Sequence, residues 1–256
     1  MDMGLKGKAA IITGGSRGLG RSMALALATE GCQVAICARG KETLQATVQE
    51  LRGLGAEAIG VRADIASAED PERVYKETKE AFGKVDIIVA NAGGRRGTDI
   101  LATTDAEWSE LFQFNLMGNI RLMRLAIPEM QQRHWGRIIT ISSIWGREYG
   151  SNVTYMTAKA ALIGMTKNLS VQLAPYNILV NCVAPGSVAF PGGGWGRLVE
   201  QQPGQAKEFI KQNLPLGRFG RPEEIGSVVA FLASEKASLL TGACINVDGG
   251  QSKSLI

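Results

Sequence analysis

The sequence predicts an α/β fold in which a doubly wound, seven-stranded parallel sheet carries helices on both faces. Seven short, apolar, β-branched runs alternate with longer segments of helical period, as repeated βα units require. Most of these runs are apolar at successive positions, which is typical of strands buried on both faces. The 256 residues are 45% hydrophobic and 20% charged, and no linker or shift in composition divides them. We therefore expect one domain, residues 1–256, with a full-sized core.

The expected strands follow one another with helical segments between them. Helical period is visible after the first strand, where Leu19, Met23 and Leu27 share a face, and Gly31 and Gly83 stand where helices would end. Parallel strands need crossover connections, which are right-handed. The seven strands are predicted over residues 9–13, 33–38, 57–62, 85–90, 137–142, 178–184 and 243–247.

Composition argues against several classes of function. Lys and Arg number 28 against 24 Asp and Glu, a net charge of +4, and the basic residues are scattered, so no nucleic-acid surface is expected. The single histidine, His134, and four cysteines without a CxxC pair cannot supply a multi-histidine metal site, and we do not expect His134 to be catalytic. No segment reads as a signal peptide or a membrane span. We expect a cytoplasmic, metal-free protein.

A glycine-rich segment, TGGSRGLG at residues 13–20, closes the first strand and opens an amphipathic helix. A phosphate-binding loop requires this context. Gly14 allows the tight turn, Gly18 lets the backbone approach a pyrophosphate, and Gly20 permits close packing of the helix. The helix N-terminus faces the anion with unpaired N–H groups. An ordinary βα turn is the alternative, but the context favours dinucleotide binding and a single-domain Rossmann fold.

Five motifs in order resemble the classical short-chain dehydrogenase/reductase family over nearly the whole chain, and especially its 3-oxoacyl-carrier-protein reductase-like members. They are TGxxxGxG at residues 13–20, the NAG of Asn91, Ala92 and Gly93, the helix asparagine Asn115, the YxxxK of Tyr155 and Lys159, and Pro185-Gly186 after the sixth strand. Carrier-protein reductases of the family often have a basic residue before the sixth strand, where this chain reads APYN. That departure weakens a carrier-protein substrate, although Arg133 could serve.

The reacting groups follow from the same motifs. Tyr155 and Lys159 share one face of a helix; a phenol has a pKa of about 10 in water, but a nearby ammonium favours the phenolate, so Tyr155 can act as acid and base. One hydroxyl of Ser142 or Ser143, at the end of the fifth strand, can stabilise a developing oxyanion. Alignment with the family favours Ser143, and the family's usual spacing keeps Ser142 open. The resemblance implies that Asn115 holds a water that links Lys159 to solvent.

The end of the second strand indicates the cofactor. NAD-selective members of the family carry a carboxylate there, whereas this chain has Arg39, which together with Arg17 can bind a 2′-phosphate, unless both arginines merely point to solvent. We therefore expect NADP(H). Phe190 replaces a threonine that commonly contacts the carboxamide, so that contact would come from backbone or Ser187, and Asp64 is expected at the adenine. The expected cofactor contacts are Gly14, Ser16, Arg17, Gly18, Leu19, Gly20, Arg39, Asp64, Ile65, Asn91, Ala92, Gly93, Tyr155, Lys159, Pro185, Gly186 and Val188.

The function expected from these residues is hydride transfer between NADP(H) and a ketone or secondary alcohol, with Tyr155 as the acid/base. A sugar or polyol dehydrogenase and a dinucleotide-binding regulator without turnover are the alternatives. Residues 187–213 form a long, glycine-containing connection, which we expect to act as a lid. The lid would place Trp195 or Phe190 over an apolar pocket that accepts bulky ketones.

The family resemblance also implies a homotetramer. The pair Phe231-Leu232 and the strand at residues 243–247 are candidates for its interface, unless they fill the core. The expected partners are a small-molecule carbonyl or alcohol substrate and further copies of the chain, with no nucleic acid and no membrane.

Overall fold

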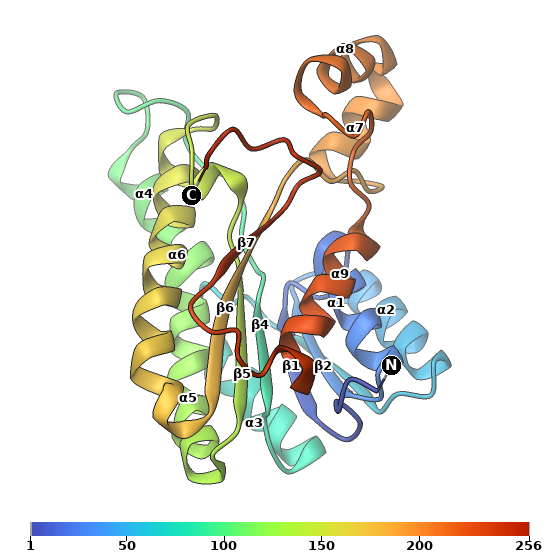
Figure 1. The fold of residues 1–256 in the computed structure, drawn as a ribbon, viewed down its shortest axis with the longest axis vertical. Coiled ribbons are helices and arrows are strands. Elements are labelled where there is room, and N and C mark those ends of the chain that lie inside the picture. Colours follow the sequence, from blue (N-terminus) through green and yellow to red (C-terminus); the bar gives the residue numbers. More distant parts are fainter. Residues whose placement is uncertain (1, 256) are drawn as a thin grey trace.

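A computed structural model describes residues 2–255 and shows one seven-stranded sheet between two layers of helices (Figure 1). All neighbouring strands are parallel, in the order β3-β2-β1-β4-β5-β6-β7. The predicted doubly wound sheet is thereby confirmed, and the chain crosses over β1 between β3 and β4, which places a crevice at the carboxyl ends of these strands. The strands are β1 (Ala9–Thr13), β2 (Gln33–Ala38), β3 (Ala58–Arg62), β4 (Ile87–Ala90), β5 (Gly136–Ile141), β6 (Ile178–Pro185) and β7 (Cys244–Val247).

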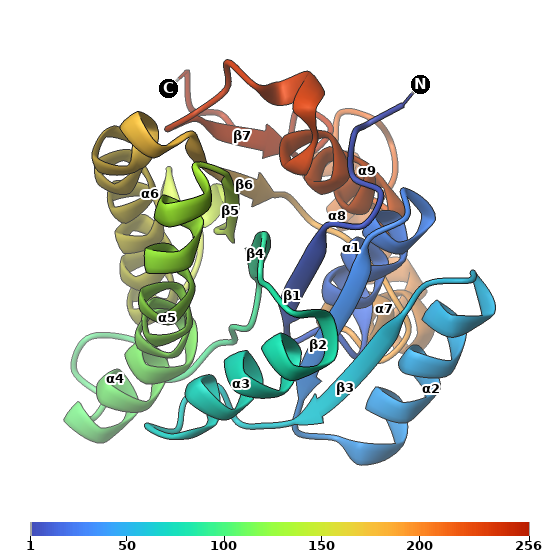
Figure 2. The ribbon, with the colours of Figure 1, turned by 90° about the horizontal axis from the view of Figure 1, so that it is seen from below.

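The two faces of the sheet bury separate cores because successive strand residues point in opposite directions. Ile12 packs with the layer of α1, α2 and α9, whereas its neighbour Ile11 packs with the layer of α3, α5 and α6. Figure 2 looks along the layers and separates α1 and α2 from α5 and α6. The bounds are α1 (Gly18–Thr29), α2 (Lys41–Gly53), α3 (Asp70–Phe82), α4 (Asp105–Phe112), α5 (Gly118–Arg133), α6 (Val153–Leu173) and α9 (Pro222–Ala233), with a π-helical turn, Gln113–Met117, between α4 and α5.

The ends of the helices follow the local sequence. Gly31 and Gly83, predicted at helix ends, have φ of +83° and +75°, a conformation that glycine adopts without a Cβ penalty. His134 caps the C-terminal end of α5 with φ of +50°, two residues before β5 begins. It therefore lies at the amino end of the sheet, opposite the crevice.

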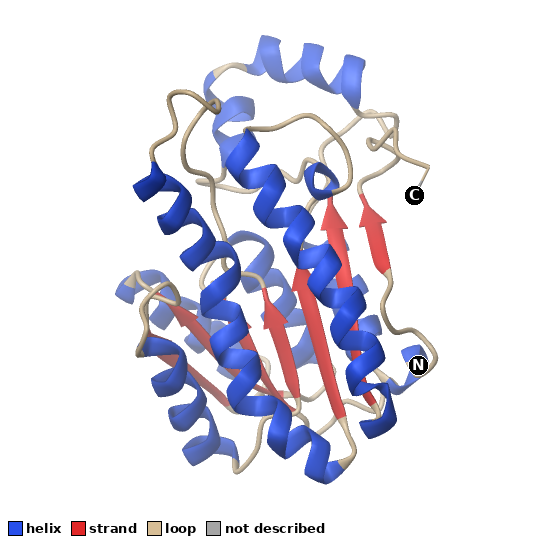
Figure 3. Ribbon diagram, turned by 90° about the vertical axis from the view of Figure 1, so that its left-hand side faces the viewer, coloured by secondary structure: helices blue, strands red, loops and turns tan. Residues whose placement is uncertain are grey.

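Residues 187–213 are more ordered than the expected long connection. They contain α7 (Gly194–Gln201) and α8 (Pro203–Asn213), raised beyond the carboxyl ends of the strands (Figures 1 and 3). Trp195 lies 4.4 Å from Phe209 and 5.3 Å from Phe219 between ring centroids, so α7 and α8 share an aromatic cluster with Phe219, which follows them in the chain. The expectation of a loop is corrected: apolar side chains at helical spacing fold this segment onto itself.

Two further features concern residues 2–255 as a whole. No helix in this range is long and apolar enough to cross a membrane. In the same range, no three His, Cys, Asp or Glu side chains gather where they could hold a metal ion. Cys32, Cys37 and Cys182 are buried free thiols, as expected for small apolar residues, and Cys244 is partly exposed.

Candidate active site

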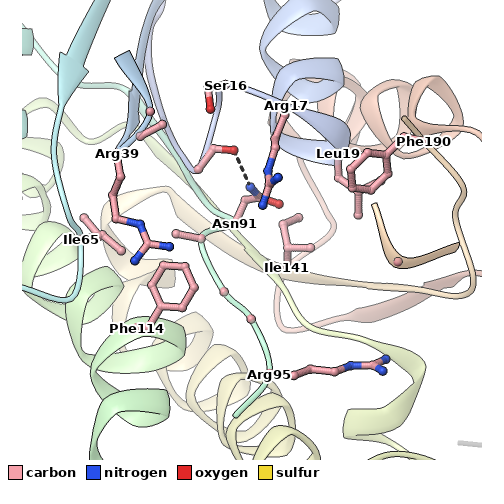
Figure 4. A pocket seen from close by; sticks show the side chains of 18 of the residues that line it. Ser16, Arg17, Leu19, Arg39, Ile65, Asn91, Arg95, Phe114, Ile141 and Phe190 are labelled. Carbon is pink, nitrogen blue, oxygen red and sulfur yellow. Dashed lines mark hydrogen bonds between the residues drawn. The ribbon is translucent and has the colours of Figure 1, made fainter. Parts of the chain in front are cut away.

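A cavity of about 1050 Å³ lies at the carboxyl ends of β1, β2, β4 and β5, between the glycine-rich loop and the segment of α7 (Figure 4). Small-molecule sites usually measure about 300–1,000 Å³, so this volume can hold a dinucleotide together with a small substrate. Most of the expected cofactor contacts line it, namely Gly14, Ser16, Arg17, Leu19, Gly20, Arg39, Asp64, Ile65, Asn91, Ala92, Gly93, Tyr155 and Lys159.

The glycine-rich loop forms one wall. Gly14 has φ of +65°, and a Cβ on Gly20 would lie 2.1 Å from the carbonyl oxygen of Gly14, so both glycines are required by the turn itself. Arg17 precedes the first turn of α1 and gives that turn no side-chain cap, which leaves the N–H groups of the helix N-terminus available to an anion. Gly18 was expected to let the backbone approach a pyrophosphate, but its α carbon faces the ring of Phe190. A Cβ on Gly18 would come within 2.5 Å of that ring.

Arg39 stands at the corner of the cavity where the second strand ends. Its Nη1 lies 3.7 Å from Oδ2 of Asp64, and its guanidinium carbon lies 5.4 Å from the centre of the Phe114 ring. Both Arg39 and Arg17 line the cavity (Figure 4), so they face the site rather than only bulk solvent. Asp64, expected at the adenine, thus pairs with Arg39, and Thr43 and Phe114 complete this corner.

The loop after β4 is fixed by a buried polar network. The hydroxyl of Thr13 donates to Oδ1 of Asn119 at 2.9 Å and accepts from the N–H groups of Asn91 and Ala92, each at 2.9 Å. Nδ2 of Asn91 donates to the carbonyl of Thr13 at 2.8 Å. The NAG loop and the glycine-rich loop are therefore held as one unit, because a buried polar group left unpaired is costly.

Tyr155 and Lys159 lie one turn apart on α6 and both line the cavity. Lys159 is 4% exposed; its Nζ donates to the carbonyl of Ile141 at 2.8 Å and lies 5.6 Å from the centre of the Tyr155 ring. The ammonium is thus anchored to the end of β5, beside the tyrosine.

Cys37 also lines the cavity, but burial raises the pKa of its thiol to about 12, so it remains protonated and is a poor nucleophile.

The two serines after β5 make different hydrogen bonds. The Ser142 hydroxyl donates to the carbonyl of Lys159 at 2.8 Å. The Ser143 hydroxyl accepts from the N–H of Trp145 at 3.2 Å, and within residues 2–255 it donates to no acceptor. Ser142 lines the cavity and Ser143 is not among its lining residues, whereas the Ser143 hydroxyl is the one left free to donate, so there is a geometric argument for each serine.

Asn115 lies in the π-helical turn and is fully buried. Its Nδ2 donates to the carbonyls of Leu111 and Gly94, and its Oδ1 accepts from the N–H of Gly94. A Cβ on Gly93 would lie 2.6 Å from Oδ1 of Asn115 and 3.2 Å from Nζ of Lys159. Asn115 therefore stands next to Lys159 behind the NAG loop, and π-helical turns are frequent at functional sites.

The structure does not bring every expected contact to this cavity. Pro185, Gly186 and Val188 lie outside it, and the last two line a second cavity of about 180 Å³. Ser187 also lines that second cavity, and its backbone N–H and hydroxyl both bind the side chain of Gln251. Ser187, expected as a possible carboxamide contact, therefore faces Gln251 and the second cavity and does not line the cavity that holds Tyr155 and Lys159.

Sequence reasoning missed several residues that line the cavity. Phe114 neighbours the asparagine that the motif identified, and Arg95 follows the NAG motif by two residues. Arg197 and Leu198 come from α7. Only the adjacency of Arg95 and Phe114 to motif residues could have signalled them, because the position of α7 depends on the tertiary fold.

Comparison with known proteins agrees with the fold and the motifs. A family described as "Enoyl-(Acyl carrier protein) reductase" matches residues 14–252. The 3-oxoacyl-[acyl-carrier-protein] reductase FabG of Aquifex aeolicus is 38% identical over 252 residues, which cover 98% of this chain and 99% of that relative.

Solved structures give the same result. L-Sorbose reductase from Gluconobacter frateurii, complexed with NADPH and L-sorbose, superposes with a TM-score of 0.93 at 33% identity over 100% of both chains. An NAD+-bound xylitol dehydrogenase superposes with a TM-score of 0.88 at 30% identity, over 96% of this chain and 99% of the other. With five motifs in order and matches over nearly its whole length, the chain belongs to the short-chain dehydrogenase/reductase family of oxidoreductases.

Proposed function

We propose that the chain is an NADP(H)-dependent oxidoreductase that transfers hydride between the nicotinamide and a ketone or secondary alcohol. One observation carries the proposal: Tyr155 and Lys159 line the same cavity as the glycine-rich loop and Arg39. Bound NADP(H) supplies the hydride chemistry, and the protein supplies binding, orientation and proton transfer.

The cavity fits a dinucleotide phosphate. Gly20 has no room for a Cβ, and the uncapped N-terminus of α1 offers N–H groups to a pyrophosphate. Arg39 and Arg17 offer guanidinium groups to a 2′-phosphate, and charge-assisted bonds of this kind are roughly twice as strong as neutral ones. The NADPH bound in the L-sorbose reductase supports the same cofactor for this chain.

Tyr155 is the acid/base in this proposal. Its hydroxyl donates a proton to the carbonyl oxygen during reduction and accepts one from the alcohol during oxidation. The Lys159 ammonium lies beside the phenol, and the fully buried Asn115 would hold a water that links Lys159 to solvent. We assign the oxyanion contact to Ser143, because the Ser142 hydroxyl already binds the carbonyl of Lys159.

The test is turnover by the purified protein with NADPH and a panel of neutral and charged ketones, followed by loss of the absorbance of the reduced nicotinamide. Reduction of at least one ketone is expected. Tight NADPH binding without turnover of any ketone or alcohol would leave the dinucleotide-binding regulator as the function.

A sugar or polyol dehydrogenase is the second candidate, favoured by the similarity to the xylitol dehydrogenase. It uses the same residues and differs in direction and substrate. Polyols with NADP⁺ or NAD⁺ therefore belong in the same panel, and faster oxidation of a polyol than reduction of any ketone would favour this candidate.

The segment of α7 and α8 is proposed as the lid. Phe190 and Trp195 both line the cavity, and the aromatic cluster of Trp195 with Phe209 lets the two helices move as one body. Closure would cover the substrate and exclude water.

A homotetramer in the cytoplasm is also proposed. Strand β7 is an edge of the sheet and half-buried, and an uncovered edge invites pairing. Phe231 is partly exposed and Leu239 almost fully so, whereas Leu232 is 1% exposed and belongs to the core. Free cysteines suit a reducing compartment. Light scattering should give four times the chain mass of 27.3 kDa, and the mass of a monomer would contradict the tetramer. Recovery of the protein in a cell fraction other than the cytoplasm would contradict the proposed compartment.

A further inference from the structure

The reaction end of the cavity carries a positive charge that the proposed cofactor does not use. Arg95, in the loop after β4, lines the cavity with its guanidinium carbon 5.0 Å from the centre of the Tyr155 ring. Figure 4 shows its side chain at the end of the pocket away from Arg17 and Arg39. The two groups assigned to the 2′-phosphate are therefore separate from Arg95, which lies next to the reacting group.

Arg95 has no acidic partner among residues 2–255. The adjacent Arg96, on the same loop, pairs with Glu110 at 2.9 Å between Nε and Oε1. Both arginines are exposed, but they differ: Arg96 pairs with Glu110 and does not line the cavity, whereas Arg95 lines it beside Tyr155 without an acidic partner.

The other charged residues that line the cavity do not neutralise Arg95. Among the described residues that line it, Asp64 is the one carboxylate, and it pairs with Arg39 at the opposite end. Arg197, from α7, adds a further guanidinium to the lining, and its Nη1 donates to the carbonyl of Gly192. Charges of one sign that line a cleft attract ligands of the opposite sign.

We propose that Arg95 determines specificity by binding an anionic group, a carboxylate or a phosphate, on the ketone or alcohol substrate. The inference deepens the proposed function and rests on it. A guanidinium binds either anion through two parallel N–H···O bonds. The 5.0 Å between Arg95 and the Tyr155 ring keeps the anion a few bonds from the reacting carbon, while Trp195 and Leu198 offer apolar contact to the carbon chain.

The test compares matched substrates that differ in charge. Levulinate and methyl levulinate form the carboxylate pair, and dihydroxyacetone phosphate and dihydroxyacetone form the phosphate pair. With NADPH and the wild-type protein, kcat/KM of the anionic member is expected to exceed that of its neutral partner about tenfold or more in at least one pair, since a hydrogen bond to a charged group is worth that factor. Which pair shows the preference identifies the anion.

Variants assign the preference to its residue. Arg95→Gln should lower the anionic-to-neutral ratio about tenfold, through KM of the anionic substrate, while the Kd for NADPH measured without ketone remains near wild type. Arg95→Lys should keep part of the ratio, because a point charge remains. Arg96→Gln is the matched control on the same loop and should leave the ratio unchanged.

Two results would overturn the inference: equal kcat/KM within both pairs for the wild type, or an anionic preference that Arg95→Gln retains in full. The failure of the proposed function looks different, because no ketone of either charge would then be reduced. Reduction of neutral ketones without any preference for anions removes the role of Arg95 alone.

Discussion

Gly20 provides a sharp test of how the glycine-rich loop is built. It is the third residue of α1, and a Cβ on it would lie 2.1 Å from the carbonyl oxygen of Gly14 and 2.7 Å from Nδ2 of Asn91. The first distance is more than 1 Å shorter than the 3.4 Å at which ordinary contact begins. Gly14 is held at φ of +65°, and Asn91 is bonded to the carbonyl of Thr13. Neither neighbour can move without breaking the turn or the hydrogen bond.

Gly20→Ala is therefore expected to destabilise the protein and to weaken the cofactor together. Overpacking costs about 1–3 kcal/mol, and because the obstacle is backbone we expect about 3 kcal/mol, or a loss of roughly 6–12 °C in Tm for a domain of this size. When the glycine-rich loop moves to make room for the Cβ, it loses charge-assisted bonds to the pyrophosphate, so NADPH affinity should fall about tenfold or more.

The assays are thermal unfolding by circular dichroism without cofactor and titration of NADPH fluorescence. Gly53→Ala is the matched control, because Gly53 ends α2 with nothing within 4 Å of its Cβ position; its Tm should stay within about 2–4 °C of wild type. Wild-type Tm and NADPH affinity in Gly20→Ala would refute the reasoning.

Three other perturbations address the cofactor, the lid and an ion pair beside the lid. Arg39→Ala should raise the Kd for NADPH far more than that for NADH, because only NADPH carries the 2′-phosphate; an equal loss, or a wild-type preference for NADH, contradicts the assignment. Limited proteolysis should cut residues 187–213 in the free protein and less so with NADPH bound, and equal protection in both states counts against a lid. Glu224 binds Arg218 and the N–H of Arg221, which lowers its carboxyl pKa from 4.5 to about 2. Its stabilising effect is then present above pH 4.5 and lost as the pH falls toward 2. After allowance for solvent screening, Glu224→Gln should cost about 1 kcal/mol at neutral pH, and chemical unfolding should show this difference shrinking below pH 4.5, whereas a constant difference would exclude the ionised carboxylate as its source.

The fold could be predicted because the strands are marked by local patterns. Residues 9–13 and 33–38 match β1 and β2, and the other strands agree to within two residues. The region of residues 85–90 shows the cause of the small errors: Val85 is buried like a strand residue, but the ladder begins at Ile87, since Asp86 uses its carboxylate to bind the N–H of Ala9. Burial is readable from the sequence, whereas the partner of each backbone group is not.

The family and most of the cavity wall could also be predicted, because the motifs lie at the carboxyl ends of strands, where doubly wound sheets form their crevice. Tyr155 and Lys159 indeed line it; their catalytic roles remain predictions. The side chain of Arg95 and the contact of Phe190 with Gly18 could not be placed in advance. Their positions depend on how the loop after β4 and the segment of α7 fold across the crevice, which no local pattern specifies.

Tyr155→Phe tests the central claim most directly, because it keeps the ring that lines the cavity and removes the only proton at issue. With the best ketone of the panel, kcat should fall by a factor of about 10² or more, the usual contribution of general acid catalysis, while the Kd for NADPH stays near its wild-type value. Turnover of Tyr155→Phe close to that of the wild type would contradict the assignment of Tyr155 as the acid/base.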